Sequence, residues 1–173
     1  INQNKTLDVQ LFTTEKTSNL FIPPSNIKIH IPKIGLLKYF WRQIGINKIA
    51  KKEEINIFHG LSNEIPIGLN KNIKSIVTIH DVIFKKYPYL YNPFDRFIYT
   101  KKTKHACEKS NKIITVSNQT KEDLVTYFKV NPEKISVIYQ TCHDSFKKKQ
   151  KNPDILKKYN LPNDFLLSVG TIE

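Results

Sequence analysis

The sequence predicts an α/β fold in which a parallel β-sheet is flanked by helices. Short runs rich in β-branched residues alternate with segments of helical periodicity, which is the order that parallel strands and their crossover helices require. The 173 residues suffice for one such domain and the start of a second. Hydrophobic residues make up 39% of the chain and charged residues 25%, which is typical of globular proteins and excludes a collagenous or wholly disordered chain.

The first half of the chain predicts four strands and one helix. Alternating apolar and polar residues predict strands at 7–13 and 27–31, and apolar side chains at helical spacing predict a helix from 34 to about 52. A brief strand is expected at 55–58. The more continuous apolar run at 73–79 predicts a strand near the centre of the sheet.

The second half continues the alternation. Asn92 and Pro93 predict a helix start, because asparagine caps helices and proline suits the first helical position, and this helix should run to about Ser110. The same patterns predict a strand at 112–116, a helix after Ser117, a strand at 135–139, a lysine-rich linker at 147–151, a short helix at 153–159 and a strand at 165–169.

The chain is strongly basic, with 28 Lys+Arg against 15 Asp+Glu and a net charge of +13. A field of this sign attracts polyanions, anionic lipids or a diphosphate substrate. Only Arg42 and Arg96 are arginines, however, and arginine is the residue that reads bases and clamps phosphates. With no nucleic-acid-binding motif in the chain, no nucleic acid partner is expected.

The two cysteines, Cys107 and Cys142, lie 35 residues apart and form no C-x-x-C pair. This favours a reducing compartment over a disulfide framework. No spacing typical of zinc ligands occurs either, so no metal site is expected.

The stretch from Lys16 to Lys52 combines eight basic residues, no acidic one and the aromatic run Tyr39, Phe40 and Trp41. One interpretation is a surface that meets anionic lipid head groups, with aromatic side chains at the interface and lysines reaching phosphates. The other is an apolar stripe that faces the core, beside a solvated lysine face.

Polar side chains follow three of the predicted strands, at the end where open parallel sheets bind ligands. His59 and His80 end two neighbouring strands, and Ser117 begins a helix after a third. Each histidine is either a hydrogen-bonded strand-end residue or a site residue, and Ser117 is either a plain helix cap or a ligand for phosphate or sugar oxygens. The chain has neither a P-loop nor a G-x-G-x-x-G motif.

Four segments of the chain resemble family 4 glycosyltransferases, in the order found there: "IFHGLSNEIPIGL", "IVTIHDVIFKKYPYLYNPFDRFIY", "ACEKSNKIITVSNQTKEDL" and "PEKISVIYQTCHDSF". The resemblance implies the Rossmann-like N-terminal, acceptor-side domain of a two-domain GT-B enzyme at 1–144. Residues 145–173, ending in "FLLSVGTIE", are similar to a linker and the first strand of the donor-binding domain. Because the chain lacks methionine, we expect it to be a piece of a longer protein.

The resemblance also implies site residues. The catalytic residues implied are His80 and Asp81. His80 matches a histidine near the transferred sugar, where a hydrogen bond would favour an oxocarbenium-like transition state, and Asp81 would hold that loop or His80 itself. The substrate-binding residues implied by the other motifs are His59, Asn63, Glu64, Ser117 and Thr120. No metal and no cofactor are expected.

The activity implied is retaining transfer of a hexose, with mannose favoured, from a nucleotide-diphosphate sugar to a saccharide or lipid-linked acceptor in surface polysaccharide synthesis. The expected location is cytoplasmic, with peripheral contact to the inner membrane face through an anionic membrane surface. Alone, this fragment is expected to be inactive, because catalysis needs both cleft walls. Two alternatives stay open: a non-catalytic basic domain that binds a polyanion or membrane surface, and a Rossmann-type domain that binds another small ligand.

Overall fold

The computed structural model describes residues 7–14, 24–32, 41–142, 153–162 and 164–168. The chain divides into two compact units, Ile1–Tyr139 and Gln140–Glu173, and the first contains the sheets and all helices but one of those described.

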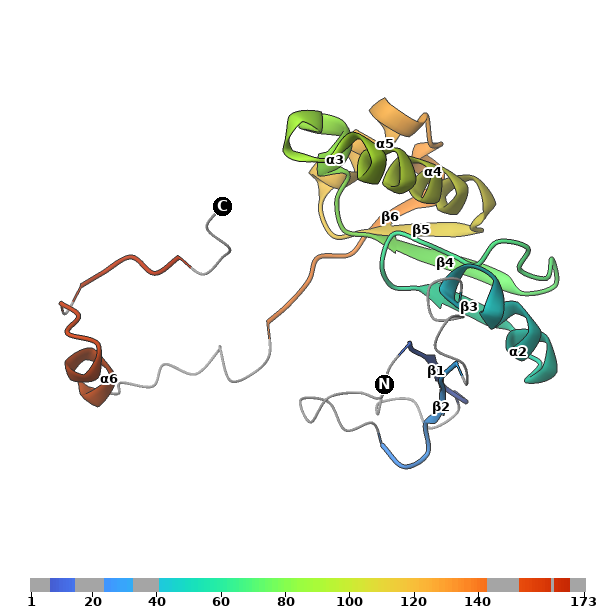
Figure 1. The fold of residues 1–173 in the computed structure, drawn as a ribbon, viewed down its shortest axis with the longest axis horizontal. Coiled ribbons are helices and arrows are strands. Elements are labelled where there is room, and N and C mark those ends of the chain that lie inside the picture. Colours follow the sequence, from blue (N-terminus) through green and yellow to red (C-terminus); the bar gives the residue numbers. More distant parts are fainter. Residues whose placement is uncertain (1–6, 15–23, 33–40, 143–152, 163, 169–173) are drawn as a thin grey trace. The chain divides into compact units, whose positions relative to one another are not determined.

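The first unit contains two parallel sheets (Figure 1). In the smaller sheet, β1 (Gln10–Phe12) pairs with β2 (Lys28–His30). The larger sheet has the order β3-β4-β5-β6, and its strands are β3 (Ile57–Gly60), β4 (Lys74–Ile79), β5 (Lys112–Thr115) and β6 (Ile135–Val137). This Rossmann-like arrangement confirms the predicted fold class. The strand expected near the sheet centre, β4, is an interior strand.

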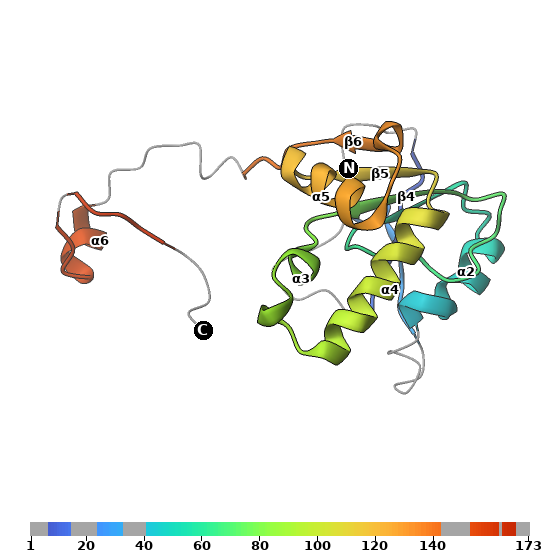
Figure 2. The ribbon, with the colours of Figure 1, turned by 90° about the horizontal axis from the view of Figure 1, so that it is seen from above.

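Helices precede β3 and connect β4 to β5 and β5 to β6 in the larger sheet. They are η2 (Trp41–Gly45), α2 (Ile46–Lys52), α3 (Ile83–Lys86), η3 (Pro88–Leu90), α4 (Pro93–Lys109), α5 (Asn118–Phe128) and η4 (Pro132–Lys134). Figure 1 shows α3, α4 and α5 together on one side of this sheet, and Figure 2 shows α4 crossing beside its strands. The pairs β4–β5 and β5–β6 are thus joined by helical crossovers, as predicted, whereas the segment 61–73 between β3 and β4 contains no helix.

The helix starts follow the predicted capping. Asn92 Oδ1 accepts the Phe94 N–H at 2.9 Å, and Pro93 is the first helical residue. Ser117 Oγ accepts the Thr120 N–H at 3.1 Å and so caps α5. Each cap satisfies an amide that the helix itself leaves unpaired.

The core lies between the larger sheet and its helices. Alternate residues of β4 are buried, among them Val77 and Ile79, which are fully inaccessible. Ile113 of β5 and Leu124 of α5 complete the centre of this cluster. The period of two in β4 directs one set of side chains to the core, and the register of the sheet is thereby fixed.

The structure separates the first two strands from the larger sheet and decides between the two interpretations of Trp41. Strands β1 and β2 form a sheet of their own instead of extending the larger one. Phe12 of β1 nevertheless packs against Phe58 of β3, with 6.2 Å between the centres of the two rings. Trp41 is buried, with 7% of its surface exposed, so it belongs to the core and not to a membrane-facing aromatic run. Tyr39 and Phe40 lie outside the described residues.

The second unit contains α6 (Pro153–Lys158), which confirms the short helix expected there. The strand expected at 165–169 is absent from its described part, 164–168. A strand needs a hydrogen-bonded neighbour, and within the described residues of this unit no other strand offers one. The predicted linker at 147–151 lies outside the described residues.

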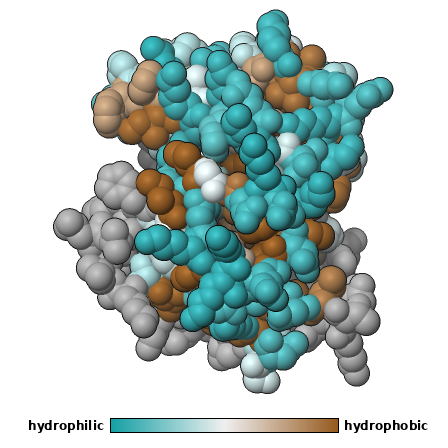
Figure 3. Space-filling view, turned by 90° about the vertical axis from the view of Figure 1, so that its right-hand side faces the viewer, coloured by the Kyte–Doolittle hydropathy of each residue, from teal (hydrophilic) through white to brown (hydrophobic). Residues whose placement is uncertain are grey.

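Figure 3 shows a face of the protein on which hydrophilic side chains predominate, with separate hydrophobic groups between them. Among the described helices, none combines the length and the apolar character needed to cross a membrane.

Lys134 stabilises the C-terminal end of α4. Its ammonium group donates to the carbonyl oxygens of Cys107 and Glu108, where the helix leaves carbonyls unpaired and its dipole is negative. Burial lowers the pKa of Lys134. We expect Lys134→Met to lower the free energy of unfolding by about 1–2 kcal/mol in urea denaturation. Lys104→Met, which removes an exposed lysine paired with Glu108 at 3.8 Å, should change it by less than about 0.5 kcal/mol; equal losses would contradict the role of Lys134.

Candidate active site

The predicted site residues gather where β3, β4 and β5 end. His59 is the last residue but one of β3. His80 and Asp81 directly follow β4, and Ser117 follows the end of β5 by two residues. Because these strands are parallel and adjacent, their carboxyl ends meet at one edge of the sheet. The segments after β3, β4 and β5 are in fact linked there by side-chain hydrogen bonds.

Asn63 links the segment after β3 to the segment after β4 through three hydrogen bonds. Its backbone N–H donates to the Thr78 carbonyl at 3.0 Å. Its side-chain Oδ1 accepts the His80 N–H at 2.9 Å, and its Nδ2 donates to the Asp81 carbonyl at 3.1 Å. The residue has φ 54°, a left-handed conformation that asparagine tolerates better than most residues. Asn63 therefore fixes the backbone on both sides of the His80–Asp81 peptide.

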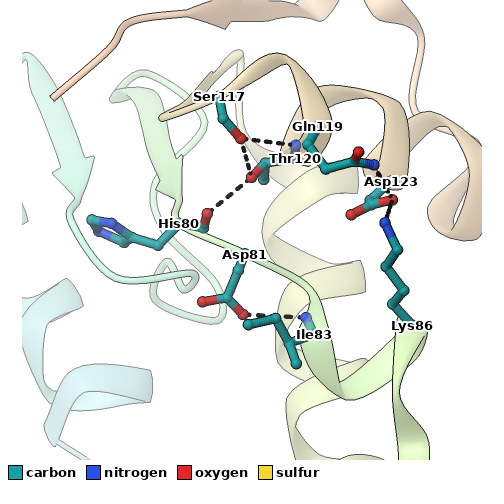
Figure 4. A network of polar contacts seen from close by, with 8 residues as sticks. All are labelled: His80, Asp81, Ile83, Lys86, Ser117, Gln119, Thr120 and Asp123. Carbon is teal, nitrogen blue, oxygen red and sulfur yellow. Dashed lines mark hydrogen bonds and ion pairs between the residues drawn. The ribbon is translucent and has the colours of Figure 1, made fainter. Parts of the chain in front are cut away.

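The His80 imidazole is held on the side of the loop opposite to α5. Its Nε2 lies 2.9 Å from the Leu61 carbonyl oxygen, and since a carbonyl only accepts, Nε2 carries the hydrogen. In the neutral ring Nδ1 is then the acceptor. Figure 4 shows the ring directed away from Thr120, while the His80 carbonyl points toward it. His80 is partly exposed, and Nε2 is the ring nitrogen bound to Leu61.

Ser117 and Thr120 anchor the His80 backbone to α5. The buried Thr120 hydroxyl donates to the His80 carbonyl at 3.0 Å, and the hydroxyls of Ser117 and Thr120 lie 2.9 Å apart. Both hydroxyls thus have protein partners, and the two residues act on the site by holding His80. The direct contact of Ser117 and Thr120 with a substrate stays a prediction.

Asp81 shapes the start of α3. Its Oδ1 accepts the Ile83 N–H at 3.2 Å, a contact drawn in Figure 4. Farther along the same helix, Lys86 pairs with Asp123 of α5 at 3.6 Å. The Lys86–Asp123 pair joins α3 to α5, and Asp81 uses one of its two carboxylate oxygens to hold the start of α3.

Glu64 is the centre of an ion network. One carboxylate oxygen lies 2.9 Å from Arg42 Nε, and the other lies 2.9 Å from Lys102 Nζ and 2.8 Å from Gln43 Nε2. The Glu64 side chain is only 12% exposed. It connects η2 and α4 to the segment after β3, so its first role is to orient two cations. The sequence did not single out Arg42 or Lys102, because neither stands in a motif and both meet Glu64 only in the fold.

A cavity of about 310 Å³ lies beside this network. Its lining residues are Arg42, Ser62, Asn63, Glu64, Asp81, Phe84, Tyr91, Tyr99, Lys102 and Thr103. Three of the predicted site residues therefore share one cavity: Asn63, Glu64 and Asp81. The lining combines charged groups with aromatic rings, which is the composition that pockets for polar organic ligands require.

Four predicted residues stand outside this lining: His59, His80, Ser117 and Thr120. His80 is adjacent to it through Asp81 and Asn63. His59 is exposed, and its Nε2 lies 2.9 Å from Thr78 Oγ1 of the neighbouring strand. Tyr91 and Tyr99, which the sequence analysis left out, lie in the cavity wall. The sequence around these two tyrosines did not indicate a site, since aromatic residues at such spacing most often belong to the core.

His59 makes stability depend on pH. Partial desolvation lowers its pKa below the ordinary 6.5, so below about that pH the unfolded chain binds protons that the folded chain does not. Stability should therefore fall as the pH drops from 7 to 5. We expect His59→Gln to flatten this slope in denaturation curves measured across that range. Some slope should persist, because burial also lowers the pKa of His30; an unchanged slope would contradict the assignment.

Among residues 7–14, 24–32, 41–142, 153–162 and 164–168, no group of three or more His, Cys, Asp or Glu side chains could hold a metal ion.

The family match agrees with this geometry. The family model described as Glycosyltransferase Family 4 matches residues 4–159, whereas no curated protein matches the chain. The matched region includes the parallel sheet, the cavity and all seven predicted site residues. Since it spans most of the 173 residues, the chain belongs to glycosyltransferase family 4.

Proposed function

We propose that the chain forms the acceptor-side wall of the cleft in a retaining hexosyltransferase. Membership in a glycosyltransferase family implies a sugar donor and an acceptor in general. The finer assignment is a nucleotide-diphosphate hexose, with mannose favoured, as donor and a saccharide or lipid-linked acceptor in surface polysaccharide synthesis. Residues 1–144 would form the N-terminal domain and 145–173 the beginning of the donor-binding domain.

The observation that carries this proposal is the way Asn63 and Thr120 clamp the loop after β4. Asn63 holds His80 and Asp81 from one side at 2.9 and 3.1 Å, and Thr120 holds the His80 carbonyl from the other at 3.0 Å. A loop that is held by two neighbouring segments has little conformational freedom. Its side chains therefore keep a fixed orientation, as catalysis by positioning of the reactants requires. It also places Asp81 in the cavity wall.

Each group then has a chemical task. The His80 ring, with Nε2 committed to Leu61, offers Nδ1 to the hydroxyl or ring substituents of the transferred sugar. The second carboxylate oxygen of Asp81, a residue of the cavity wall, would accept a hydrogen bond from a hydroxyl of the acceptor saccharide. In retaining transfer of this kind, the C1–O bond to the diphosphate breaks as the acceptor oxygen bonds to C1 on the same face. The departing phosphate oxygen takes the acceptor proton, so no side-chain nucleophile, metal or cofactor is needed.

Saccharide binding tests the acceptor-side assignment. We expect oligosaccharides to shift the NMR signals of Asn63, Asp81 and Thr103 in the 173-residue chain, and nucleotide-diphosphate sugars to shift them little. Asp81→Asn keeps the oxygen that caps α3 but removes the charge, so it should weaken saccharide binding by roughly tenfold and leave the fold intact. Strong binding of nucleotide sugars without saccharide binding would contradict the proposal.

Turnover tests the two-domain assignment. The 173-residue chain should show no transfer with any nucleotide-diphosphate hexose, because the donor contacts are assigned to a second domain. The same domain joined to a donor-binding domain should transfer hexose with retained anomeric configuration, as read from the product by NMR. Measurable turnover by the 173-residue chain alone, or an inverted product, would contradict this part.

A further inference from the structure

Four large apolar side chains stand exposed within nine residues that follow the candidate site. Tyr89 is 79% exposed, Leu90 59%, Phe94 69% and Phe97 59%. We call these four residues the aromatic patch. Apolar side chains are common on protein surfaces singly, but four within nine residues, three of them aromatic, are typical of an interaction site.

The patch is held on well-defined backbone. Tyr89 and Leu90 belong to η3, and Phe94 and Phe97 lie three residues apart on α4, so they share one side of that helix. Arg96 joins the two elements, because its guanidinium donates to the Pro88 carbonyl at 3.3 Å. The exposed rings are therefore presented by fixed elements, and they are not side chains of a chain end.

The charge around the patch is positive. Residues 83–104 contain six basic side chains and one acidic one, Asp95. Three of the six, Lys86, Lys102 and Lys104, pair with carboxylates. Lys101 lies one turn beyond Phe97, with its ammonium 5.5 Å from the centre of that ring. Lys85 stands over the Phe128 ring at 5.9 Å, on the neighbouring α5. A surface of exposed tyrosine, phenylalanine and leucine among lysines suits the head-group region of an anionic bilayer.

The basic stretch 16–52 fits that role less well. Its Trp41 is buried in the core. In the described part of this stretch, no exposed aromatic side chain accompanies the lysines. The lipid contact expected from the sequence is therefore better assigned elsewhere.

We propose that the aromatic patch docks the protein on an anionic membrane surface. Tyr89, Leu90, Phe94 and Phe97 would enter the head-group region, while Lys101 and its neighbours contact lipid phosphates. Tyr91 and Tyr99, from the same segment, line the cavity. If the proposed function holds, a lipid-linked acceptor would thus meet the site at the membrane; docking itself does not depend on that function.

Vesicle sedimentation with the 173-residue chain tests the docking. We expect binding to phosphatidylcholine vesicles that contain 30% phosphatidylglycerol, weakened by added salt, and little binding to pure phosphatidylcholine. The triple variant Tyr89→Ser, Phe94→Ser, Phe97→Ser should lower the partition coefficient at least about tenfold, because three rings no longer leave water. These positions are exposed, so the fold should persist. Unchanged fluorescence emission of the buried Trp41 in the variant would show this.

A matched control replaces exposed apolar residues elsewhere. Ile57→Thr with Ile138→Thr removes two side chains that are 61% and 55% exposed and should leave vesicle binding unchanged. The proposal is overturned if the triple variant binds like the native chain, or if Lys48→Gln, Lys51→Gln, Lys52→Gln abolishes binding instead. It is also overturned if the native chain does not bind anionic vesicles. In that case, a triple variant that is a monomer where the native chain is a dimer would assign the patch to self-association.

Discussion

Gly60→Ala should lower the free energy of unfolding by about 3 kcal/mol, one of the largest effects expected for a single methyl group in this chain. Gly60 is buried at the end of β3, and a Cβ there would lie 2.1 Å from the Glu64 carbonyl oxygen and 3.1 Å from Ile65 Cγ2. The obstacle is backbone, so no side chain can rotate to relieve it. The segment that carries Asn63 and Glu64 would have to move.

Gly68→Ala is the matched control. Gly68 has φ +77°, so alanine is strained there, but its nearest neighbour, Asn47 Nδ2, lies 3.6 Å from the added Cβ. Urea denaturation should show a loss of about 1 kcal/mol at Gly68, from backbone strain alone. Similar losses at both positions would mean that the contact at Gly60 relaxes easily. In that case the loop after β3 is less rigid than its hydrogen bonds indicate.

The elements that the sequence predicted best are those whose signals are local. The Asn92–Pro93 cap placed the start of α4 at the correct residue, and Ser117 marked the start of α5. The apolar run at 73–79 identified an interior strand, in which buried residues alternate with partly buried ones. These patterns consist of residues close together in the sequence, so they can be recognised without the rest of the fold.

Features that depend on distant residues were less predictable. Nothing local to Trp41 distinguished a core residue from an interfacial one, and its burial follows from the packing of η2 against the core. Glu64 was expected to contact substrate, but its network depends on Arg42 and Lys102, 22 and 38 residues away. The role of Asn63 as a clamp likewise appears only when the segments after β3 and β4 lie together.

His80→Ala should lower the turnover of an enzyme that joins this domain to a donor-binding domain by about a hundredfold or more, if the ring stabilises charge in the transition state. The fold should persist, because the loop is held through the His80 backbone by Asn63 at 2.9 Å and Thr120 at 3.0 Å. The melting temperature of the 173-residue variant checks this. A large loss of stability with an equal loss of turnover would make His80 a structural residue instead.

Two conservative variants show which ring nitrogen acts. In His80→Gln, the side-chain amide lies where Nε2 of the histidine lies and can keep the hydrogen bond to the Leu61 carbonyl. In His80→Asn, the shorter side chain puts its amide where Nδ1 lies. Since Nε2 already donates to the Leu61 carbonyl at 2.9 Å, the sugar should meet Nδ1. We therefore expect His80→Asn to retain more of kcat than His80→Gln, although Gln preserves more of the native hydrogen bonding. The opposite order would mean that substrate binding breaks the contact with Leu61 and that Nε2 turns toward the sugar.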